Sequence, residues 1–394
     1  MGKKKKIIIV AHAMRLGGVE TSLLGLLYSF DFNKYDVDLF LYLHDGEFLE
    51  YIPKAVNLIN EHKDYASLLL PFSKNKLSVK IAKIASKLYS SIFVKRHKIK
   101  GENFVYLLTL HRYSHVLLPK VSNKRYDLAL SFLTPHYTVL NKIYAKNKIA
   151  WIHTDYSQYG LDKTNEYKMW SKFKYIASIS NDSTKAFLSV FPKLSEKVTL
   201  IENILPQEFV MSRSLAFKVD FDNKKINLCS VGRFSYPKNF DNIPEITKLL
   251  VDYGLDVVWY IIGYGPDEAV IKKKIYKFGI DKHVLLLGKK SNPYPYIKAC
   301  DIYVQPSRFE GKAVTVREAQ MLHKPVVITD FPSSNAQLED DVDGVILPME
   351  TEAFANALRT FILNTKKQSE LIDNCKQTDF SNVKEIDKIY SFIQ

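Results

Sequence analysis

The sequence predicts an α/β protein made of two doubly wound, Rossmann-like parallel-sheet domains. Short, nearly continuous apolar runs of strand length alternate with helical patterns along the chain. This alternation lapses over residues 205–225 and then begins again, which places a linker there. Such strands are typical of parallel sheets that helices cover on both faces. We therefore expect one domain over residues 1–205 and a second over residues 206–379.

The individual elements follow from the same pattern, taken in chain order. In the first half we expect strands at 7–11, 37–43, 127–132, 149–153 and 175–180, and a helix at 20–30. In the second half we expect strands at 226–231, 257–262, 284–287, 302–305 and 326–329, with helices at 242–253, 267–278, 294–299 and 315–322. Ligands of such sheets bind at the carboxyl ends of the strands, and with two domains also between them.

Composition excludes several classes of protein. The 394 residues are 46% hydrophobic and 25% charged, which excludes collagen-like, low-complexity and wholly disordered chains. The three cysteines lie far apart without a CxxC pair, which argues against a disulfide scaffold or a cysteine zinc site and fits a reducing cytosol. The apolar runs fall short of the ~20 residues that a membrane-spanning helix needs.

The net charge of +14 is concentrated in one part of the chain. Residues 1–205 contain 31 Lys and Arg against 17 Asp and Glu, whereas residues 206–394 contain 25 of each. Residues 51–124 alone hold 14 basic and 3 acidic residues. Such a patch indicates a polyanionic partner, which could be nucleic acid, an anionic bilayer or an acidic substrate.

A basic amphipathic helix is expected around residues 74–100, within this patch. Its apolar residues form one helical stripe, and its lysines run one position behind. The stripe consists of Leu77, Ile81, Ile84, Leu88 and Ile92, and the lysines are Lys76, Lys80, Lys83 and Lys87. The helix therefore either docks on an anionic membrane surface or packs in the core with its lysines solvated.

Two glycine turns follow predicted strands. Gly17 and Gly18 precede a helix, where the backbone can approach a ligand and free N–H groups are available. Gly263 and Gly265 lie in a similar turn after the strand at 257–262. The turn at Gly17 and Gly18 lacks the GxGxxG spacing of a dinucleotide site, so a plain chain reversal explains it equally well. The turn at Gly263 and Gly265 could hold a base or ribose by backbone contacts, but a plain chain reversal is the favoured interpretation.

Two further stretches carry charges at strand ends. Arg233 and Lys238 lie five residues apart, and cations at such a position suit a diphosphate. Glu310 and Glu318 flank a stretch in which Gly311 precedes a predicted helix start. We expect the N–H groups of residues 312–315 to be unpaired and aimed at an anion. Solvated loop charges and two ordinary surface glutamates are the alternative interpretation.

Together these stretches resemble the retaining glycosyltransferases of family 4, which have the GT-B fold. The motifs stand in the family's order: GGVE at 17–20, VGRFSYPK at 231–238, GYGP at 263–266, EGKAVTVREA at 310–319 and HKPVVIT at 323–329. The resemblance covers most of residues 220–348 and is patchy before 205. It is nearest to bacterial capsule and exopolysaccharide enzymes, although Lys312 and Arg317 replace a more apolar, glycine-rich stretch.

The resemblance implies an active site in the cleft between the two domains, with residues 380–394 returning to the first domain. It implies that Arg233 and Lys238 neutralise the departing diphosphate, and that Glu310 and the strand-end His153 contact the donor sugar. Glu318 would accept hydrogen bonds from the ribose hydroxyls. The donor-binding set it implies is Gly17, Gly18, Gly265, Gly311, Lys312, Ala313, Val314, Thr315 and Glu318.

The activity implied is retaining, metal-independent transfer from a nucleotide sugar, a UDP-sugar, to a lipid-linked saccharide or other glycan acceptor in bacterial surface polysaccharide synthesis. We expect no metal and no cofactor, since no Asp-x-Asp pair stands after a strand. The enzyme would be cytoplasmic and peripheral on the inner face of the membrane, which it would contact through the basic helix. No nucleic-acid partner is expected. The alternatives are a protein or cell-wall polymer acceptor, an inactive nucleotide-sugar-binding subunit, and a nucleic-acid binder.

Overall fold

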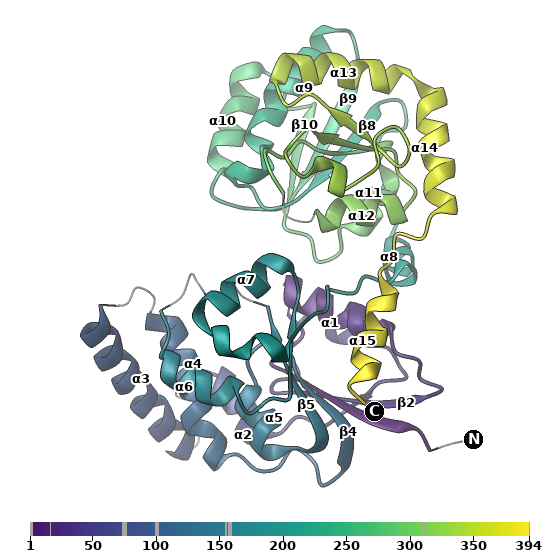
Figure 1. Ribbon diagram of the computed structural model, residues 1–394. Coiled ribbons are helices and arrows are strands. Elements are labelled where there is room, and N and C mark those ends of the chain that lie inside the picture. Colours follow the sequence, from purple (N-terminus) through teal and green to yellow (C-terminus); the bar gives the residue numbers. More distant parts are fainter. Residues whose placement is uncertain are drawn as a thin grey trace. The chain divides into compact units, whose positions relative to one another are not determined.

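The chain divides into two compact units. The computed structural model describes residues 3–15, 17–72, 77–98, 102–153, 156, 160–310 and 313–393. The first unit consists of residues 1–205 with 382–394, and the second of residues 206–381 (Figure 1).

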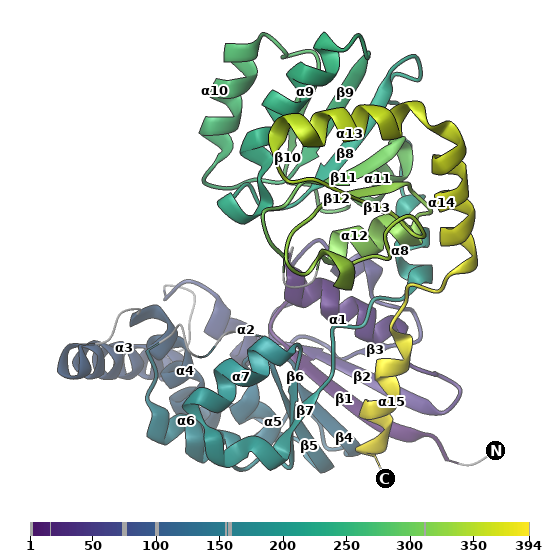
Figure 2. The same cartoon turned by 45° about the horizontal axis from the view of Figure 1, so that its top comes forward.

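The first unit is built on a seven-stranded sheet in the order β3-β2-β1-β4-β5-β6-β7. The strands are β1 (Lys5–Ala11), β2 (Tyr35–Leu41), β3 (Asn57–Leu58), β4 (Arg125–Ser131), β5 (Tyr144–Ile152), β6 (Tyr175–Ser178) and β7 (Val198–Leu200). Neighbouring strands are parallel throughout (Figure 2). The central strands are buried because helices cover both of their faces, and Ile7 to Val10 of β1 have no exposed surface.

The helices of this unit come from both ends of the chain. They are α1 (Gly18–Tyr28), α2 (Lys63–Leu69), α3 (Leu77–His97), α4 (Glu102–Ser114), α5 (His136–Lys142), α6 (Lys163–Trp170), α7 (Asn181–Val190) and α15 (Ile386–Ser391). The C-terminal α15 joins the unit through Tyr390, whose ring stacks on Tyr35 at 4.2 Å. The Asn147 amide also donates to the carbonyl of Phe392 at 2.7 Å.

The second unit contains a six-stranded parallel sheet in the order β10-β9-β8-β11-β12-β13. Its strands are β8 (Ile226–Val231), β9 (Val257–Ile262), β10 (Val284–Gly288), β11 (Ile302–Gln305), β12 (Val326–Thr329) and β13 (Val345–Leu347). Its helices are α8 (Gln207–Ser214), α9 (Ile243–Asp252), α10 (Glu268–Phe278), α11 (Tyr294–Ala299), α12 (Val314–Met321), α13 (Thr351–Leu363) and α14 (Thr365–Gln377). The predicted class of two Rossmann-like parallel-sheet domains is confirmed.

The predicted linker over 205–225 is not irregular throughout. Its first part forms α8, in which Phe209 and Val210 are buried. The Phe209 ring meets the edge of Tyr294 at 6.2 Å, so the helix packs against α11 within the second unit. The sequence pattern did not predict this helix, because the segment is mostly polar and only a few apolar residues pack it against the unit.

Within the described part of the chain, every helix is either too short or too polar to cross a bilayer.

In each sheet the strand order reverses at one central strand. β1 pairs with both β2 and β4, and β8 pairs with both β9 and β11. Loops leave the carboxyl ends of such neighbours in opposite directions, which opens a crevice at that edge of the sheet. The loops after β8 and β11 are those in which the charged motifs stand.

Two glycines let the loops after β8 and β9 pack against each other. Gly263 has φ +146, and a Cβ there would lie 1.8 Å from the Gly232 carbonyl oxygen. At Gly265 a Cβ would lie 2.2 Å from the Phe234 carbonyl oxygen. This close backbone packing accounts for both glycines of the GYGP turn.

We therefore predict that Gly263→Ala lowers the free energy of unfolding by at least about 3 kcal/mol, because a positive φ and a backbone clash act together. The matched control is Gly254→Ala, where φ is +84 but the space is open within 4 Å. That change should cost about 1 kcal/mol. Urea denaturation measures both, and equal losses would contradict the packing argument.

Candidate active site

The charged motifs of the second unit meet at the carboxyl edge of its sheet. Arg233 and Lys238 follow β8, and Glu310 follows β11, the strand that pairs with β8. Lys238 Nζ lies 2.6 Å from Glu310 Oε1, although 72 residues separate the two in the chain. Both side chains are largely buried, at 22% and 9% exposure. The ion pair therefore sits in a partly dehydrated place, where charges interact more strongly than in water.

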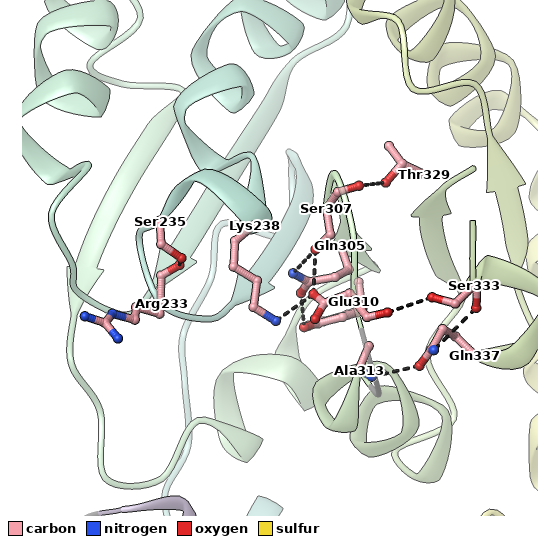
Figure 3. A network of polar contacts seen from close by, with 11 residues as sticks. Arg233, Ser235, Lys238, Gln305, Ser307, Glu310, Ala313, Thr329, Ser333 and Gln337 are labelled. Atoms are coloured by element: carbon pink, nitrogen blue, oxygen red, sulfur yellow. Dashed lines mark hydrogen bonds and ion pairs between the residues drawn. The ribbon is translucent and has the colours of Figure 1, made fainter. Parts of the chain in front are cut away.

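A line of hydrogen bonds stands behind Glu310 (Figure 3). The hydroxyl of Ser307 donates to Glu310 Oε1 at 2.6 Å, and the Gln305 amide donates to Ser307 Oγ at 3.0 Å. Tyr303 in turn donates to Gln305 Oε1 at 2.8 Å. All three supporting residues are buried, so the carboxylate is held in one orientation. No sequence motif pointed to these three residues, although Gln305 and Ser307 stand directly at a strand end.

The chain on either side of residues 311 and 312 is also fixed. Ser333 Oγ donates to the Glu310 carbonyl at 2.6 Å, and the Ala313 N–H donates to Gln337 Oε1 at 2.7 Å. The expectation that the Ala313 amide is unpaired is therefore wrong, because Gln337 lies within reach of it. Gly311 and Lys312, two expected donor-binding residues, lie outside the described residues.

The remaining members of that stretch begin α12. Val314 is 44% exposed and Thr315 lies in the first turn. The first amides of a helix have no partner within the helix, so those of Val314 and Thr315 can face an anion.

Glu318 lies one turn further along α12 and is buried. Its Oε1 accepts a hydrogen bond from the Tyr294 hydroxyl at 2.8 Å. Burial raises the pKa of Glu318 to about 7, and the bond from Tyr294 opposes that rise. Tyr294 was not foreseen, because nothing in the spacing of the chain relates residue 294 to residue 318.

Arg233 does not join this group. It is exposed, and Figure 3 shows its guanidinium pointing away from Glu310. Among the described residues its guanidinium has no hydrogen-bond or ion-pair partner. The structure thus brings Lys238 and Glu310 together and leaves the Arg233 side chain exposed to solvent.

The first unit carries the other expected residues. Gly17 is the N-cap of α1, and a Cβ at Gly18 would meet nothing within 4 Å. His153 follows β5, with its ring 4.3 Å from that of Phe132. Its Nε2 is buried and has no hydrogen-bond partner among the described residues. Burial lowers the pKa of His153 to about 3, so the imidazole is neutral at pH 7.

Three more histidines surround the switch point of this sheet, the half-buried His12 and the buried His111 and His136. His12 follows β1 and stacks on His111 of α4, with ring centroids 5.0 Å apart. His136 starts α5, and its Nδ1 lies 2.8 Å from Ser131 Oγ. Burial lowers the pKa of His12 to about 4 and that of His136 to about 3. Strand-end position could have pointed to His12, whereas His111, within a helix, gave no signal.

Across the described residues, no three His, Cys, Asp or Glu side chains gather as a metal site would require.

The buried carboxyl of Glu318 makes a testable contribution to stability. Its pKa rises from 4.5 to about 7 on folding, so the wild type loses stability as pH increases through that window. Glu318→Gln, which stays neutral, should gain up to about 3 kcal/mol relative to the wild type over that range. Denaturant unfolding at several pH values measures this difference. With the exposed Glu370→Gln the difference should stay flat, and a flat profile for Glu318→Gln would refute the assignment.

Residues 212–378 match the family described as glycosyl transferases group 1. The chain is 29% identical over 169 residues to UDP-Gal:alpha-D-GlcNAc-diphosphoundecaprenol alpha-1,3-galactosyltransferase of Escherichia coli, covering 40% of this chain and 43% of that one. It is 26% identical over 203 residues to N-acetylgalactosamine-N,N'-diacetylbacillosaminyl-diphospho-undecaprenol 4-alpha-N-acetylgalactosaminyltransferase of Campylobacter jejuni, covering 51% and 52%. The chain thus spans about half the length of the curated relatives it matches.

Two solved structures share the fold of nearly the whole chain. A TarM mutant of S. aureus in complex with Fondaparinux, alpha-GlcNAc-glycerol and UDP has a TM-score of 0.63 at 14% identity, covering 99% of this chain and 100% of that one. Anabaena HepE in complex with UDP and glucose has a TM-score of 0.58 at 16% identity, covering 98% of each. The expected GT-B fold is confirmed by these structures, and the match over residues 212–378 agrees with the family that the sequence motifs resemble.

Proposed function

We propose that the chain is a glycosyltransferase that moves a sugar from a UDP-sugar to a lipid-linked saccharide or other glycan acceptor in bacterial surface polysaccharide synthesis, such as that of a capsule. The observation that carries the proposal is the Lys238–Glu310 pair at the ends of β8 and β11, inside the segment that matches the family. The two curated relatives, whose names specify sugar transfer to diphosphoundecaprenol-linked saccharides, support the acceptor class.

In this proposal the second unit binds the donor. The ammonium of Lys238 has three N–H donors, so it can hold Glu310 and a phosphate oxygen at the same time. The exposed Arg233 offers a planar fork to the other phosphate. Glu310, which Ser307 keeps in place, accepts hydrogen bonds from hydroxyls of the transferred sugar. Glu318 accepts hydrogen bonds from the ribose hydroxyls, either beside the hydrogen bond from the Tyr294 hydroxyl or in place of it.

Other residues complete the proposed donor site. The backbone from Gly311 to Thr315, with Lys312, binds the distal phosphate or sugar hydroxyls. Because the Ala313 N–H already donates to Gln337, the N–H groups of Val314 and Thr315 make most of the backbone hydrogen bonds to the donor. Gly265 shapes the loop that borders the site. For the first unit, the proposal keeps the roles that the resemblance implies for Gly17, Gly18 and His153.

The proposed chemistry is transfer with retention and without a metal. The bond from the anomeric carbon to the leaving phosphate oxygen breaks, and the acceptor oxygen bonds to that carbon on the same face. The proton of the acceptor hydroxyl passes to the departing phosphate oxygen. Lys238 and Arg233 stabilise the negative charge that grows on the diphosphate. Cations that stand near the leaving group before the reaction begins need not be rearranged during it.

We place the enzyme in the cytoplasm, peripheral on the inner face of the membrane, because a lipid-linked acceptor is held there. A nucleotide-sugar-binding subunit without activity would share the donor site. It would differ in failing to turn the donor over.

The first test is the melting temperature with UDP, GDP and a panel of UDP-sugars. A ligand at about 100 times its dissociation constant stabilises the folded state by about 2.7 kcal/mol, so a true donor gives a clear shift. Turnover is then measured with a lipid-linked acceptor, with and without EDTA, and EDTA should leave the rate unchanged. If no nucleotide raises the melting temperature, the proposal fails. If UDP-sugars bind but no acceptor or water ever receives the sugar, the inactive subunit replaces it.

Lys238→Met should lower kcat by about 10²- to 10³-fold, because it removes a preorganised cation from the leaving group. The matched control is Lys248→Met on α9, whose lysine is paired with Asp252 on the surface. The control should retain full activity. Equal rates for the two variants would exclude Lys238 from the reaction.

A further inference from the structure

The apolar stripe of α3 faces outward. Leu77, Ile81, Ile84, Leu88 and Ile92 are 74%, 57%, 57%, 61% and 58% exposed. Residues of this kind normally form the core, and leaving a row of them in water forgoes the stabilisation that burial provides. Of the two interpretations that the spacing left open, packing of this stripe in the core is therefore wrong. A contiguous exposed apolar row marks a surface that contacts something else.

The other face of α3 is what attaches it to the protein. Val79, Ala82, Ser86 and Ser90 are buried, and the helix packs along α4. Figures 1 and 2 both show α3 at the margin of the first unit, with α4 beside it. Small residues thus face inward and large aliphatic ones outward, the reverse of an ordinary surface helix.

Lys83 fixes the orientation of the stripe. It is buried rather than solvated, and its Nζ donates to the carbonyl oxygens of Ser67 at 3.1 Å and Leu70 at 2.7 Å. These carbonyls lie at the C-terminal end of α2, where a cation is favourable. The expectation that Lys83 belongs to the basic edge is therefore wrong. Lys76, expected beside it, lies outside the described residues.

A shallow hollow adjoins the stripe. Phe72, Ile84, Leu88 and Tyr106 line a space of about 460 Å³, together with Lys83, Lys87 and Ser91. Phe72 is itself 48% exposed, and the Lys80 ammonium lies 5.7 Å from its ring centre. An apolar floor with ammonium groups at its border suits an acyl chain whose phosphate stays in water.

The charges of α3 select the occupant. Apart from the buried Lys83, the helix carries Lys80, Lys87, Lys95 and Arg96, and it has no acidic residue. A second copy of this face would oppose like charges, which is unfavourable. Aliphatic side chains also provide no stacking surface for nucleic-acid bases. An anionic phospholipid surface matches both the apolar row and its basic border.

We propose that α3 docks the chain on an anionic bilayer. The stripe lies flat in the boundary between headgroups and acyl chains, with the cations on lipid phosphates. Its exposed residues extend over sixteen positions, from Leu77 to Ile92, or about 22 Å of helix, so several lipids are covered at once. This inference deepens the proposed function by naming the surface that brings the enzyme to a lipid-linked acceptor, but the binding itself does not depend on sugar transfer.

The test is co-sedimentation of the full chain with vesicles of phosphatidylcholine, with and without phosphatidylglycerol. We expect binding only to the anionic vesicles, weakening as salt is raised. Ile81→Ser, Ile84→Ser and Leu88→Ser combined should lower the partition coefficient at least about tenfold, since these side chains are exposed and supply the apolar contact. Lys87→Gln, Lys95→Gln and Arg96→Gln combined should remove the preference for anionic lipid.

Matched controls lie on the second unit. Val270→Ser with Leu363→Ser changes exposed apolar residues, and Lys272→Gln with Lys366→Gln changes exposed lysines. Neither pair should alter vesicle binding. Absence of binding by the wild type, or binding that the α3 variants leave unchanged, overturns the proposal. So does a wild-type dimer in sedimentation analysis that the triple serine variant abolishes.

The melting shift with UDP, measured on the same variants, separates the two proposals. The α3 variants should retain the melting shift with UDP and lose binding to the vesicles. A wild type that binds vesicles without responding to any nucleotide would refute the proposed function and leave the docking surface standing.

Discussion

The structure depends above all on one property of parallel sheets, which is that all their carboxyl ends lie along one edge. The strands must be buried on both faces, so helices occupy the faces and polar loops are confined to the edges. Where the order reverses at β8, the loop after β8 meets the loop after β11. Lys238 and Glu310 are brought within 2.6 Å by this rule and by no local preference of the chain.

The candidate site contains three largely buried charged side chains, Lys238, Glu310 and Glu318, and hydrogen bonds and ion pairs offset the cost of burying them to different extents. Lys238 and Glu310 neutralise each other, and Ser307 binds the same carboxylate oxygen. Glu318 has only the Tyr294 hydroxyl among its described contacts, so its pKa is raised by burial. A group held in this way gains from a ligand that supplies further hydrogen-bond donors, as a ribose does. In the proposed function, the burial that destabilises the Glu318 carboxylate also prepares it to bind the ribose.

α3 departs from the rule that governs the rest of the chain. The sheet strands bury nearly every aliphatic side chain, while α3 leaves a whole row of them in water. The helix is nevertheless secured by Lys83 at the end of α2 and by small residues against α4. The exposed row is therefore a stable feature of the first unit, and the cations that border it favour contact with an anionic surface. The two proposals therefore place nucleotide chemistry on the second unit and membrane contact on the first.

The sequence by itself determined most of the sheet strands, because hydrophobic periodicity is a local property that strands and helices express directly. The fold class and the stripe on 77–92 were predictable in this way, whereas the family resemblance rested on the order of five short motifs. Tertiary structure alone decided which polar groups meet: Tyr294 with Glu318, Gln337 with the Ala313 amide, and Lys83 with the end of α2. It also decided that the stripe faces outward, since an amphipathic pattern specifies two faces but not which one the protein covers. Contacts between side chains that are far apart in the sequence depend on how the elements pack in the folded protein, and no single stretch of residues specifies that packing.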